Sequence, residues 1–525
     1  MKDFVKKLSD SKVVTYILIA ITMLLVCFYF IATKIDVKPD GDILWHYKLG
    51  EDICKTKVLS LDNPYTFLEN TEWIPHEWLY EIFIYLILSA TGAIGFCLLY
   101  AVNKICLFVV TYRLNKAKSL LSYLMVFILL SSSLTMNRGN RPAEFSVYFI
   151  LCIFYFYWSK SRYKDIWYLL LGIFIANFHG GVAMIMIAIH FILLALDICV
   201  DVYEHLSINK SKYIRCLIDI SLFILGCLIN PAGYRLFTNS FLESCSSGVT
   251  YITEWLPTTF GYVSIFCVIV MVLSFGYALY KIKHENVNEH RMDIQKIGCL
   301  CALLMLSCVS QKAFILYFVV YCVFGYSYLC DMFHDFVKLK KLPIITKNVQ
   351  LCFFNYFFGL ICFMLLLDMN NDFQKNKYLC SFKSWMNNFY AENILEELKT
   401  NYTDDTRILT SYSYGNIILF NDMKCFVDTR EWCYAKELGS CDAVDDLFYI
   451  THSQGIDKNA IDIFLDKYDF DYIWVNSELP LMTYMNMSDD YELVCTNGDE
   501  NLSVNEIYDR NLSNYECLYK KVGEK

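Results

Sequence analysis

Acidic side chains are concentrated in a hydrophilic stretch that follows the first apolar run of the chain. Residues 34–92 hold ten aspartates and glutamates, and Asp40 and Asp42 stand one residue apart near the start. Such a carboxylate can accept a proton in catalysis or bind a divalent cation. The spacing alone is more often that of a solvated acidic loop with tryptophans at a membrane surface. The other polar candidates of this stretch are His46, Glu51, His76 and Glu77.

Cationic side chains stand at the ends of later apolar runs. Arg138 and Arg141 are three residues apart, and Lys312 interrupts a long apolar region further along the chain. Arginine binds phosphate through paired hydrogen bonds, so these residues suit a phosphate group near a membrane surface. Anchoring to lipid headgroups or pairing with the acidic loop explains them equally well.

Two further polar residues, His179 and Glu254, are less specific candidates for substrate contacts. His179 stands between Phe178 and two glycines, at the end of an apolar run. A hydrogen-bonded histidine at a helix end is more common than a histidine that binds substrate. Glu254 precedes Trp255 in a hydrophilic stretch, and nothing in its spacing distinguishes it.

The apolar runs must form the frame that positions these residues. Of the 525 residues, 56% are hydrophobic and 19% charged, with a mean hydropathy of +0.37; soluble domains have roughly 45–50% and about 25%. Residues 13–33 are too long an apolar run for a cleavable signal and can cross a ~30 Å hydrocarbon layer. Together with ten more runs they predict an α-helical polytopic membrane protein of about eleven transmembrane helices. The other runs lie near 93–112, 118–133, 143–158, 165–178, 180–199, 213–230, 261–280, 297–310, 313–330 and 349–367.

The distribution of lysine and arginine predicts the sidedness of the chain. Alternate loops hold 21 and nine of these residues, and the richer set, which includes the N-terminal lysines, is assigned to the cytoplasm. The assignment requires residues 76–90, which carry Glu77 and Glu81, to form an interfacial juxtamembrane helix. It also requires helix breaks at 177–181 and 310–312. With eleven crossings, the N-terminus is cytoplasmic and the C-terminal part extracytoplasmic.

The chain after the last span has the composition of a soluble domain. Residues 368–525 hold 14 lysines and arginines against 29 aspartates and glutamates, which argues against a nucleic-acid partner. Short strand-like runs, among them 416–420, alternate with helical ones and predict a small α/β domain. Six of the 23 cysteines lie here and can pair in an oxidising compartment, in about 15 ways. The predicted domains are a transmembrane domain, 1–367, whose first external loop is 34–92, and a soluble extracytoplasmic domain, 368–525.

Short motifs follow one another along most of the chain and together resemble a known family. They are Asp42-Ile43-Leu44-Trp45-His46-Tyr47-Lys48-Leu49-Gly50-Glu51, Asp62-Asn63-Pro64-Tyr65, His76-Glu77-Trp78-Leu79, Arg141-Pro142, Asn177-Phe178-His179-Gly180, Asn230-Pro231-Ala232-Gly233, Glu254-Trp255, Tyr414-Gly415-Asn416 and Val427-Asp428-Thr429-Arg430. The layout is one span, a long external loop that opens with acids, a juxtamembrane helix and many spans. It resembles the GT-C superfamily of membrane glycosyltransferases, which includes protein O-mannosyltransferases and the aminoarabinose transferase of lipid A. Within that superfamily, the chain is most similar to a poorly characterised bacterial branch.

The resemblance implies a glycosyltransferase with a polyprenyl-phosphate-linked sugar as donor, at the outer face of a bacterial plasma membrane. Asp40 or Asp42 resembles the family's catalytic carboxylate, which takes a proton from the acceptor hydroxyl group. Arg138, Arg141 or Lys312 would stabilise the leaving polyprenyl phosphate. The acceptor is a glycan, a lipid or a protein, and a divalent cation can serve as cofactor. No Asp-Glu pair follows the first span, and the family's His-Pro-Pro element is His-Glu-Trp here, so the base and the metal requirement stay open.

Two other hypotheses fit the composition. A transporter or flippase of lipid-linked saccharide would carry charges deep in the spans, where the sequence has mainly Lys104. A non-enzymatic envelope-assembly protein would use the C-terminal domain as a docking module. The sequence has no Walker loop, no Gly-x-Ser-x-Gly elbow, no His-Glu-x-x-His and no Cys-x-x-Cys motif. ATP-driven transport and soluble-protease chemistry therefore lose support.

Overall fold

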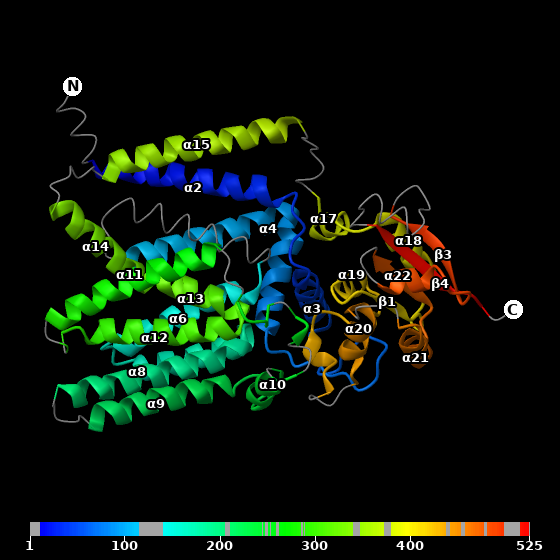
Figure 1. Ribbon diagram of the computed structural model, residues 1–525, viewed down its shortest axis with the longest axis horizontal. Coiled ribbons are helices and arrows are strands. Elements are labelled where there is room, and N and C mark those ends of the chain that lie inside the picture. The colour runs from blue at the N-terminus through cyan, green and yellow to red at the C-terminus, as the bar shows by residue number, and fades with distance from the viewer. Residues whose placement is uncertain are drawn as a thin grey trace. The chain divides into compact units, whose positions relative to one another are not determined.

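The chain folds into two compact units, each built from three separate segments (Figure 1). The helical unit comprises the described residues of 1–37, 93–229 and 253–379, and the mixed unit those of 38–92, 230–252 and 380–525. The computed structural model describes residues 11–114, 140–204, 210–243, 245–246, 250–252, 254–258, 262–284, 287, 289–339, 347–371, 380–436, 441–452, 457–476, 480–497 and 515–523.

Apolar helices make up the helical unit. They lie in all the predicted runs except 118–133, which is outside the described residues, and they break after Phe178 and after Val309, where breaks were predicted. The helices are α2 (Lys12–Lys34), the later part of α4 (Trp78–Leu114), α6 (Pro142–Trp158), α7 (Lys164–Phe178), η1 (Gly180–Val182), α8 (Ala183–Tyr203), α9 (Lys210–Cys227), α11 (Tyr262–His284), α12 (Arg291–Val309), α13 (Gln311–Phe324), α14 (Tyr326–Leu339) and α15 (Lys347–Asn371).

The lengths and surfaces of these helices suit a lipid environment. Four are long and apolar enough to cross a membrane: Lys12–Lys34, Trp78–Leu107, Gly180–Tyr203 and Arg291–Val309. Large apolar side chains are exposed on these four and on other helices of the unit, such as Leu24 on α2, Met305 on α12 and Met364 on α15. Such exposure is favourable where hydrocarbon replaces water around a helix. The prediction of a helical membrane protein is confirmed, whereas the number of eleven crossings stays a prediction. Shorter apolar helices are Pro142–Trp158, Gln311–Phe324 and Cys352–Leu366.

Helix α4 changes direction at Gly92, which has φ 63° and ψ −151°. Only glycine adopts this backbone conformation readily. A Cβ atom at this position would also lie 2.4 Å from the main-chain oxygen of Cys380. The break falls where the sequence separates the interfacial helix 76–90 from the span 93–112, so residues 78–91 belong to the mixed unit and 93–114 to the helical unit.

Helices α2 and α15 lie side by side and run in the same direction (Figure 1). Thr15 donates a hydrogen bond to Asn348 Oδ1 (2.6 Å), and Thr22 donates one to Asn355 Oδ1 (2.7 Å). Both partners advance by seven residues from one pair to the next, which is the spacing of a parallel helix pair with one repeated contact face. The C-terminal ends of α2 and α15 therefore lie at the same end of the helical unit.

We expect residues 38–92 and the C-terminal segment to share one compartment, because α2 and α15 are parallel and both segments belong to the mixed unit. A sidedness reporter inserted after the exposed residue Val58 and one fused to the C-terminus should both report the extracytoplasmic side. A reporter fused to the N-terminus is the control and should report the cytoplasm. Opposite sides for the first two fusions would contradict the arrangement.

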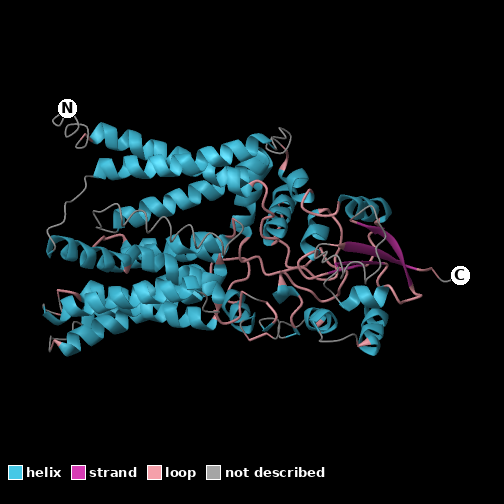
Figure 2. Ribbon diagram, turned by 45° about the horizontal axis from the view of Figure 1, so that its top comes forward, coloured by secondary structure: helices cyan, strands magenta, loops and turns pink. Residues whose placement is uncertain are grey.

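A four-stranded sheet and short helices build the mixed unit (Figure 2). Strand β1 (Ile408–Thr410) is parallel to β2 (Tyr472–Asn476), and β4 (Glu516–Lys521) is antiparallel both to β2 and to β3 (Tyr491–Thr496), giving the order β1-β2-β4-β3. The helices are α3 (Asp42–Thr56), the first part of α4, α10 (Arg235–Glu243), α17 (Phe382–Asn387), α18 (Glu392–Asn401), α19 (Gly415–Phe420), η3 (Glu431–Cys433), α20 (Ala443–His452), α21 (Lys458–Tyr468) and α22 (Pro480–Met485).

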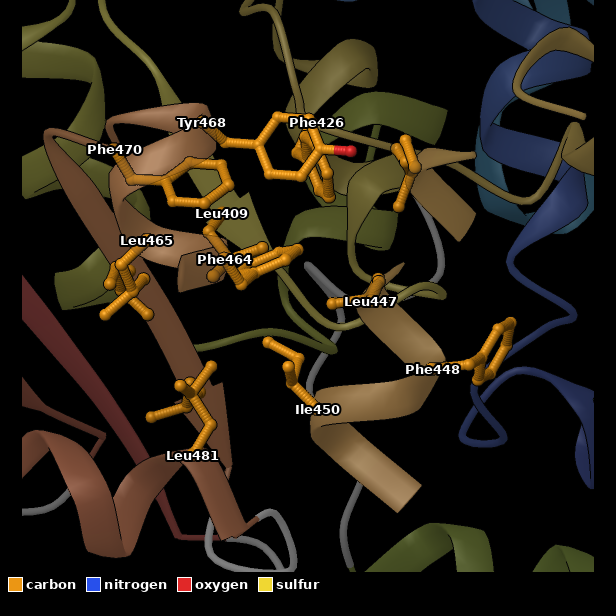
Figure 3. Close-up of a cluster of buried hydrophobic side chains, with 14 of the residues drawn as sticks. Leu409, Phe426, Leu447, Phe448, Ile450, Phe464, Leu465, Tyr468, Phe470 and Leu481 are labelled. Atoms are coloured by element: carbon orange, nitrogen blue, oxygen red, sulfur yellow. The ribbon is translucent and has the colours of Figure 1, made fainter. Parts of the chain in front are cut away.

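The core of the mixed unit joins the first hydrophilic stretch to the C-terminal segment. Trp45 and Trp73 belong to the same buried cluster as Phe426, Phe464 and other aromatic residues near the sheet. Figure 3 shows the part of this cluster around Phe426 and Phe464. The folded units thus divide the chain differently from the predicted boundary between 1–367 and 368–525. Hydropathy separates lipid-facing segments from water-facing ones, but it does not show which water-facing segments fold together.

The predicted strand at residues 416–420 is wrong. Residues 416–420 lie in helix α19, in which every residue is buried. A short apolar run rich in β-branched residues does not distinguish a strand from a buried helix. Here close packing decides the outcome, because a Cβ atom on Gly415 would lie 1.9 Å from the main-chain oxygen of Val427. The first turn of α19 therefore approaches the backbone of 427–428 at a distance that only glycine permits.

Candidate active site

Asp42 opens helix α3, and Asp40 precedes it with a local structural role. The main-chain N–H of Asp42 donates to Asp40 Oδ1 at 3.1 Å, so Asp40 accepts a hydrogen bond from the start of the helix. The Asp42 carboxylate belongs to the first turn, where the helix dipole favours negative charge. Its side chain is buried, with 9% exposure. The two aspartates that the sequence left as alternatives thus have different surroundings.

A hydrogen bond from the C-terminal segment holds the Asp42 carboxylate. The Thr429 hydroxyl donates to Asp42 Oδ1 at 2.6 Å. Asn416, which is fully buried, lies behind Thr429 and donates through Nδ2 to Thr429 Oγ1 at 2.8 Å. Both residues belong to short motifs that are visible in the sequence, but neither motif indicates a role for them. Side chains far apart in sequence meet here, so no local spacing could reveal the contact.

Histidine and glutamate side chains form a second buried group around Glu77. His46 Nε2 and His76 Nε2 each lie 3.8 Å from a Glu77 carboxylate oxygen. His76 Nδ1 is 2.8 Å from the carbonyl oxygen of Ile74, so that nitrogen carries the proton and donates. Rings of Trp45, Trp73 and Trp432 surround the two histidines. Since His46 lies one helical turn after Asp42, both side chains project from the same face of α3.

Glu51, the remaining candidate in this stretch, takes part in a different group. It lies 2.8 Å from Lys55 and 3.6 Å from Lys48. Burial opposes the charge on Lys48, but hydrogen bonds from its ammonium group to Asp422 and Asp52 raise the pKa of Lys48 to about 12. Nine residues of helix separate Glu51 from Asp42, or about 14 Å. The structure therefore does not bring Glu51 to Asp42.

A fully buried ion pair, which the sequence analysis missed, lies next to Thr429 in the chain. Arg430 donates from Nε (2.9 Å) and Nη2 (2.6 Å) to the two oxygens of Asp428. Neither side chain is exposed. Burial works against the charged guanidinium, yet the Asp428 carboxylate raises the pKa of Arg430 well above its usual value. Arg430 Nη2 also donates to Asn63 Oδ1 (3.0 Å), so this pair joins residues 62–65 to the C-terminal segment.

The helical unit brings together three of the candidates assigned to it. Arg141, which precedes α6, lies 2.6 Å from Glu254 Oε1. The main-chain N–H of Lys312 donates to the carbonyl oxygen of Glu254 at 2.8 Å, and its ammonium group lies over the Trp255 ring. Arg141 is therefore paired with an acid, but Glu254 lies outside the acidic loop, so this is not the pairing considered from the sequence.

The other two candidates of this unit are His179 and Arg138. His179 Nδ1 forms a hydrogen bond with Ser146 of α6, which begins just after Arg141. His179 thus has the hydrogen bond expected of a histidine at a helix end. Arg138 lies outside the described residues.

The acidic pattern of residues 34–92 left a divalent cation open as a cofactor. Among them, no three His, Cys, Asp or Glu side chains gather in an arrangement that could hold a metal ion. The groups around Asp42 and Glu77 are instead built from hydrogen bonds and aromatic contacts. We therefore derive no chemical step through a metal.

Comparison with known proteins identifies the fold. No protein-family model matches the chain, and no curated protein matches it by sequence. Among solved structures, it is similar to the archaeal oligosaccharyltransferase AglB from Archaeoglobus fulgidus in complex with an inhibitory peptide and a dolichol-phosphate. The TM-score is 0.53 at 9% identity, over 91% of this chain and 71% of that one. The apo form of the Archaeoglobus fulgidus oligosaccharyltransferase gives 0.52 at 9% identity, over 87% and 69%.

The chain has an oligosaccharyltransferase-like fold. At this level of identity, the likeness concerns the fold and not the substrates. It does not single out a family or a branch of one. Two chains can share this architecture although about nine in ten aligned residues differ. Each short sequence motif by itself is therefore a weak indicator of this fold.

Proposed function

We propose that the protein transfers a sugar from a polyprenyl-phosphate-linked donor to an acceptor on the outer face of the plasma membrane. The observation that carries the proposal is the buried Asp42 carboxylate, which Thr429 holds at the start of α3. The fold supports it, because AglB was solved with a dolichol-phosphate, and such a lipid phosphate is what the proposed donor would release. The acceptor is a glycan, a lipid or a protein.

In the proposed reaction, the Asp42 carboxylate takes the proton of the acceptor hydroxyl group as that oxygen forms a bond to the anomeric carbon of the sugar. The bond between this carbon and the phosphate oxygen breaks, and the polyprenyl phosphate leaves with the electron pair. Arg141 and Lys312 are proposed to attract the growing negative charge. Because Arg141 is paired with Glu254, the phosphate must share the guanidinium group or displace the carboxylate. Arg138 keeps the same proposed role.

The main alternative is a transporter of lipid-linked saccharide, which would carry charged residues deep in its spans. Such a residue, Lys104, lies 3.0 Å from Glu144 and forms a buried ion pair in the helical unit. A pair of this kind can be structural, since each charge compensates the other inside the bundle. No observation in the described residues therefore favours transport over transfer.

The proposal predicts sugar transfer by the purified full chain in liposomes. The donors to be tested are polyprenyl phosphates that carry different radiolabelled sugars, and an envelope extract supplies the acceptor. With at least one of these donors, the label should move from the lipid to a larger product. Liposomes without protein are the control. Movement of intact labelled lipid between leaflets, with no transfer from any donor, would overturn the proposal and favour a flippase.

A further inference from the structure

Two sequence motifs without an assigned role meet the segment of the proposed base at Asp42. They are the Tyr-Gly-Asn segment 414–416 and the Val-Asp-Thr-Arg segment 427–430, and the segment of the base is Asp-Gly-Asp, 40–42. We propose that Thr429 and Asn416 are positioning residues, which hold the Asp42 carboxylate through a two-step hydrogen-bond relay. The proposal rests on the proposed function, in which Asp42 is the base. The relay itself is a structural arrangement that can be tested without activity.

The direction of each hydrogen bond in the relay follows from the backbone. The main-chain N–H of Thr429 can only donate, and it donates to Asn416 Oδ1 at 3.1 Å. The Asn416 amide is thereby oriented, and its Nδ2 faces Thr429 Oγ1 at 2.8 Å as the donor. The hydroxyl group has one hydrogen, which points to Asp42 Oδ1 at 2.6 Å. A carboxylate is a stronger acceptor than the amide oxygen, which also lies 3.1 Å from Oγ1.

A third contact fixes the main chain of Thr429. The Tyr412 hydroxyl donates to the carbonyl oxygen of Thr429 at 3.1 Å. Burial, followed by the negative charges of Glu431, Asp42 and Asp428, raises the pKa of Tyr412 well above its usual value, so the phenol keeps its proton. Thr429 is therefore held through its N–H, its C=O and its hydroxyl group. A side chain with so little freedom can impose one position on the carboxylate that it contacts.

Two glycines show that the backbone is shaped for this approach. A Cβ atom on Gly41 would lie 3.2 Å from Asn416 Nδ2, and one on Gly415 would lie 1.9 Å from the Val427 oxygen. The segment before Asp42 thus comes close to the amide of the relay. Helix α19 comes close to the backbone of 427–428, which directly precedes Thr429. Side chains at either glycine would push the partners of the relay apart.

The relay also has an electrostatic consequence for Asp42. Several other titratable groups share the surroundings of Asp42. Asp40 stands just before α3, and His46 lies one helical turn after Asp42. Three more carboxylates lie near Tyr412, as Asp42 does: Asp428, Glu431 and Glu243. Nearby negative charges favour protonation of a carboxylate, whereas a hydrogen bond donated to it favours ionisation. Thr429 donates such a hydrogen bond, so it helps keep Asp42 ionised and able to accept a proton.

A double-mutant cycle on the full chain tests the relay independently of catalysis. Thr429→Val should lower the apparent melting temperature of the detergent-purified protein by about 3–10 °C, because a hydrogen bond to a charged group is lost. In an Asp42→Ala background, the same substitution should have a clearly smaller effect. Equal shifts in both backgrounds would overturn the relay.

Transfer kinetics test whether the relay positions the base. Thr429→Val should lower the transfer rate about tenfold and move the acid limb of the pH–rate profile to higher pH, whereas Thr429→Ser should restore both. Suppose the double-mutant cycle shows coupling between Thr429 and Asp42, but the pH–rate profile of Thr429→Val is unchanged. The hydrogen bond would then only stabilise the fold, and the positioning role would be overturned. If the wild-type chain transfers no sugar, the proposed function fails, while the melting cycle still decides whether the relay exists.

Discussion

Replacement of Asp42 with asparagine is expected to lower the rate of sugar transfer by about 10²–10⁴-fold, the usual contribution of a general base. Asparagine has nearly the same shape, and its amide oxygen can still accept the hydrogen bond from Thr429. It cannot take the proton of the acceptor hydroxyl group. The fold should therefore persist while the reaction slows. Initial rates of label transfer from the polyprenyl donor, together with the melting temperature, measure both properties.

The neighbouring aspartates serve as matched controls for Asp42. Asp40→Asn should retain most of the activity, because an amide oxygen can accept the N–H of Asp42 as the carboxylate does. Asp36→Asn makes the same chemical change at an exposed position earlier in the segment and should have no effect. Full activity of the Asp42 variant, or equal losses in the Asp40 and Asp42 variants, would remove Asp42 as the base.

The largest expected effect on stability concerns the buried pair of Asp428 and Arg430. Arg430→Met leaves the Asp428 carboxylate buried with no opposite charge, which costs about 3–5 kcal/mol. For a unit of this size, the apparent melting temperature should fall by about 6–20 °C. The rings of Tyr65 and Trp73, each 5.1 Å from the guanidinium group, would also lose a partner. Thermal unfolding of the purified full chain measures the change.

A surface ion pair of the same unit provides the control for Arg430. Lys436 lies 3.2 Å from Asp442, and the side chain of Lys436 is 73% exposed. Exposed pairs contribute little, so Lys436→Met should leave the melting temperature nearly unchanged. A second variant, Asp428→Asn with Arg430→Met, removes both charges and should recover part of the loss. Similar melting temperatures for the Arg430 and Lys436 variants would contradict the structural importance of the buried pair.

The helical part of the fold was largely predictable from the sequence. Long apolar runs and charged loops report directly on the solvent around each segment, so the breaks after Phe178 and Val309 could be located. Gly92 could not be identified as a turning point from hydropathy alone, although the sidedness argument separated the same two helices. Helix α19 was missed because a six-residue apolar stretch has no period that favours a strand or a helix.

The site was predicted only in part, and for a physical reason. Asp42, His46, His76 and Glu77 lie in one continuous stretch, and their chemistry is visible there. Thr429, the partner of Asp42, comes 387 residues later, and Asn416 reaches Asp42 only through Thr429. Threonine and asparagine occur throughout any sequence. Only the resemblance of the surrounding motifs to a family marked these segments. Contacts of this kind depend on tertiary structure, which no single-sequence pattern contains.

The three-segment construction of the mixed unit imposes a delay during biosynthesis. Residues 38–92 leave the ribosome well before residue 380, and at roughly 5–20 residues per second the interval is on the order of 15 to 60 s. Throughout that time, Trp45, Trp73 and the other apolar side chains of the early segment lack the later half of their core. The early segment must therefore remain soluble, or be sheltered by a chaperone, until translation of its distant partner is finished.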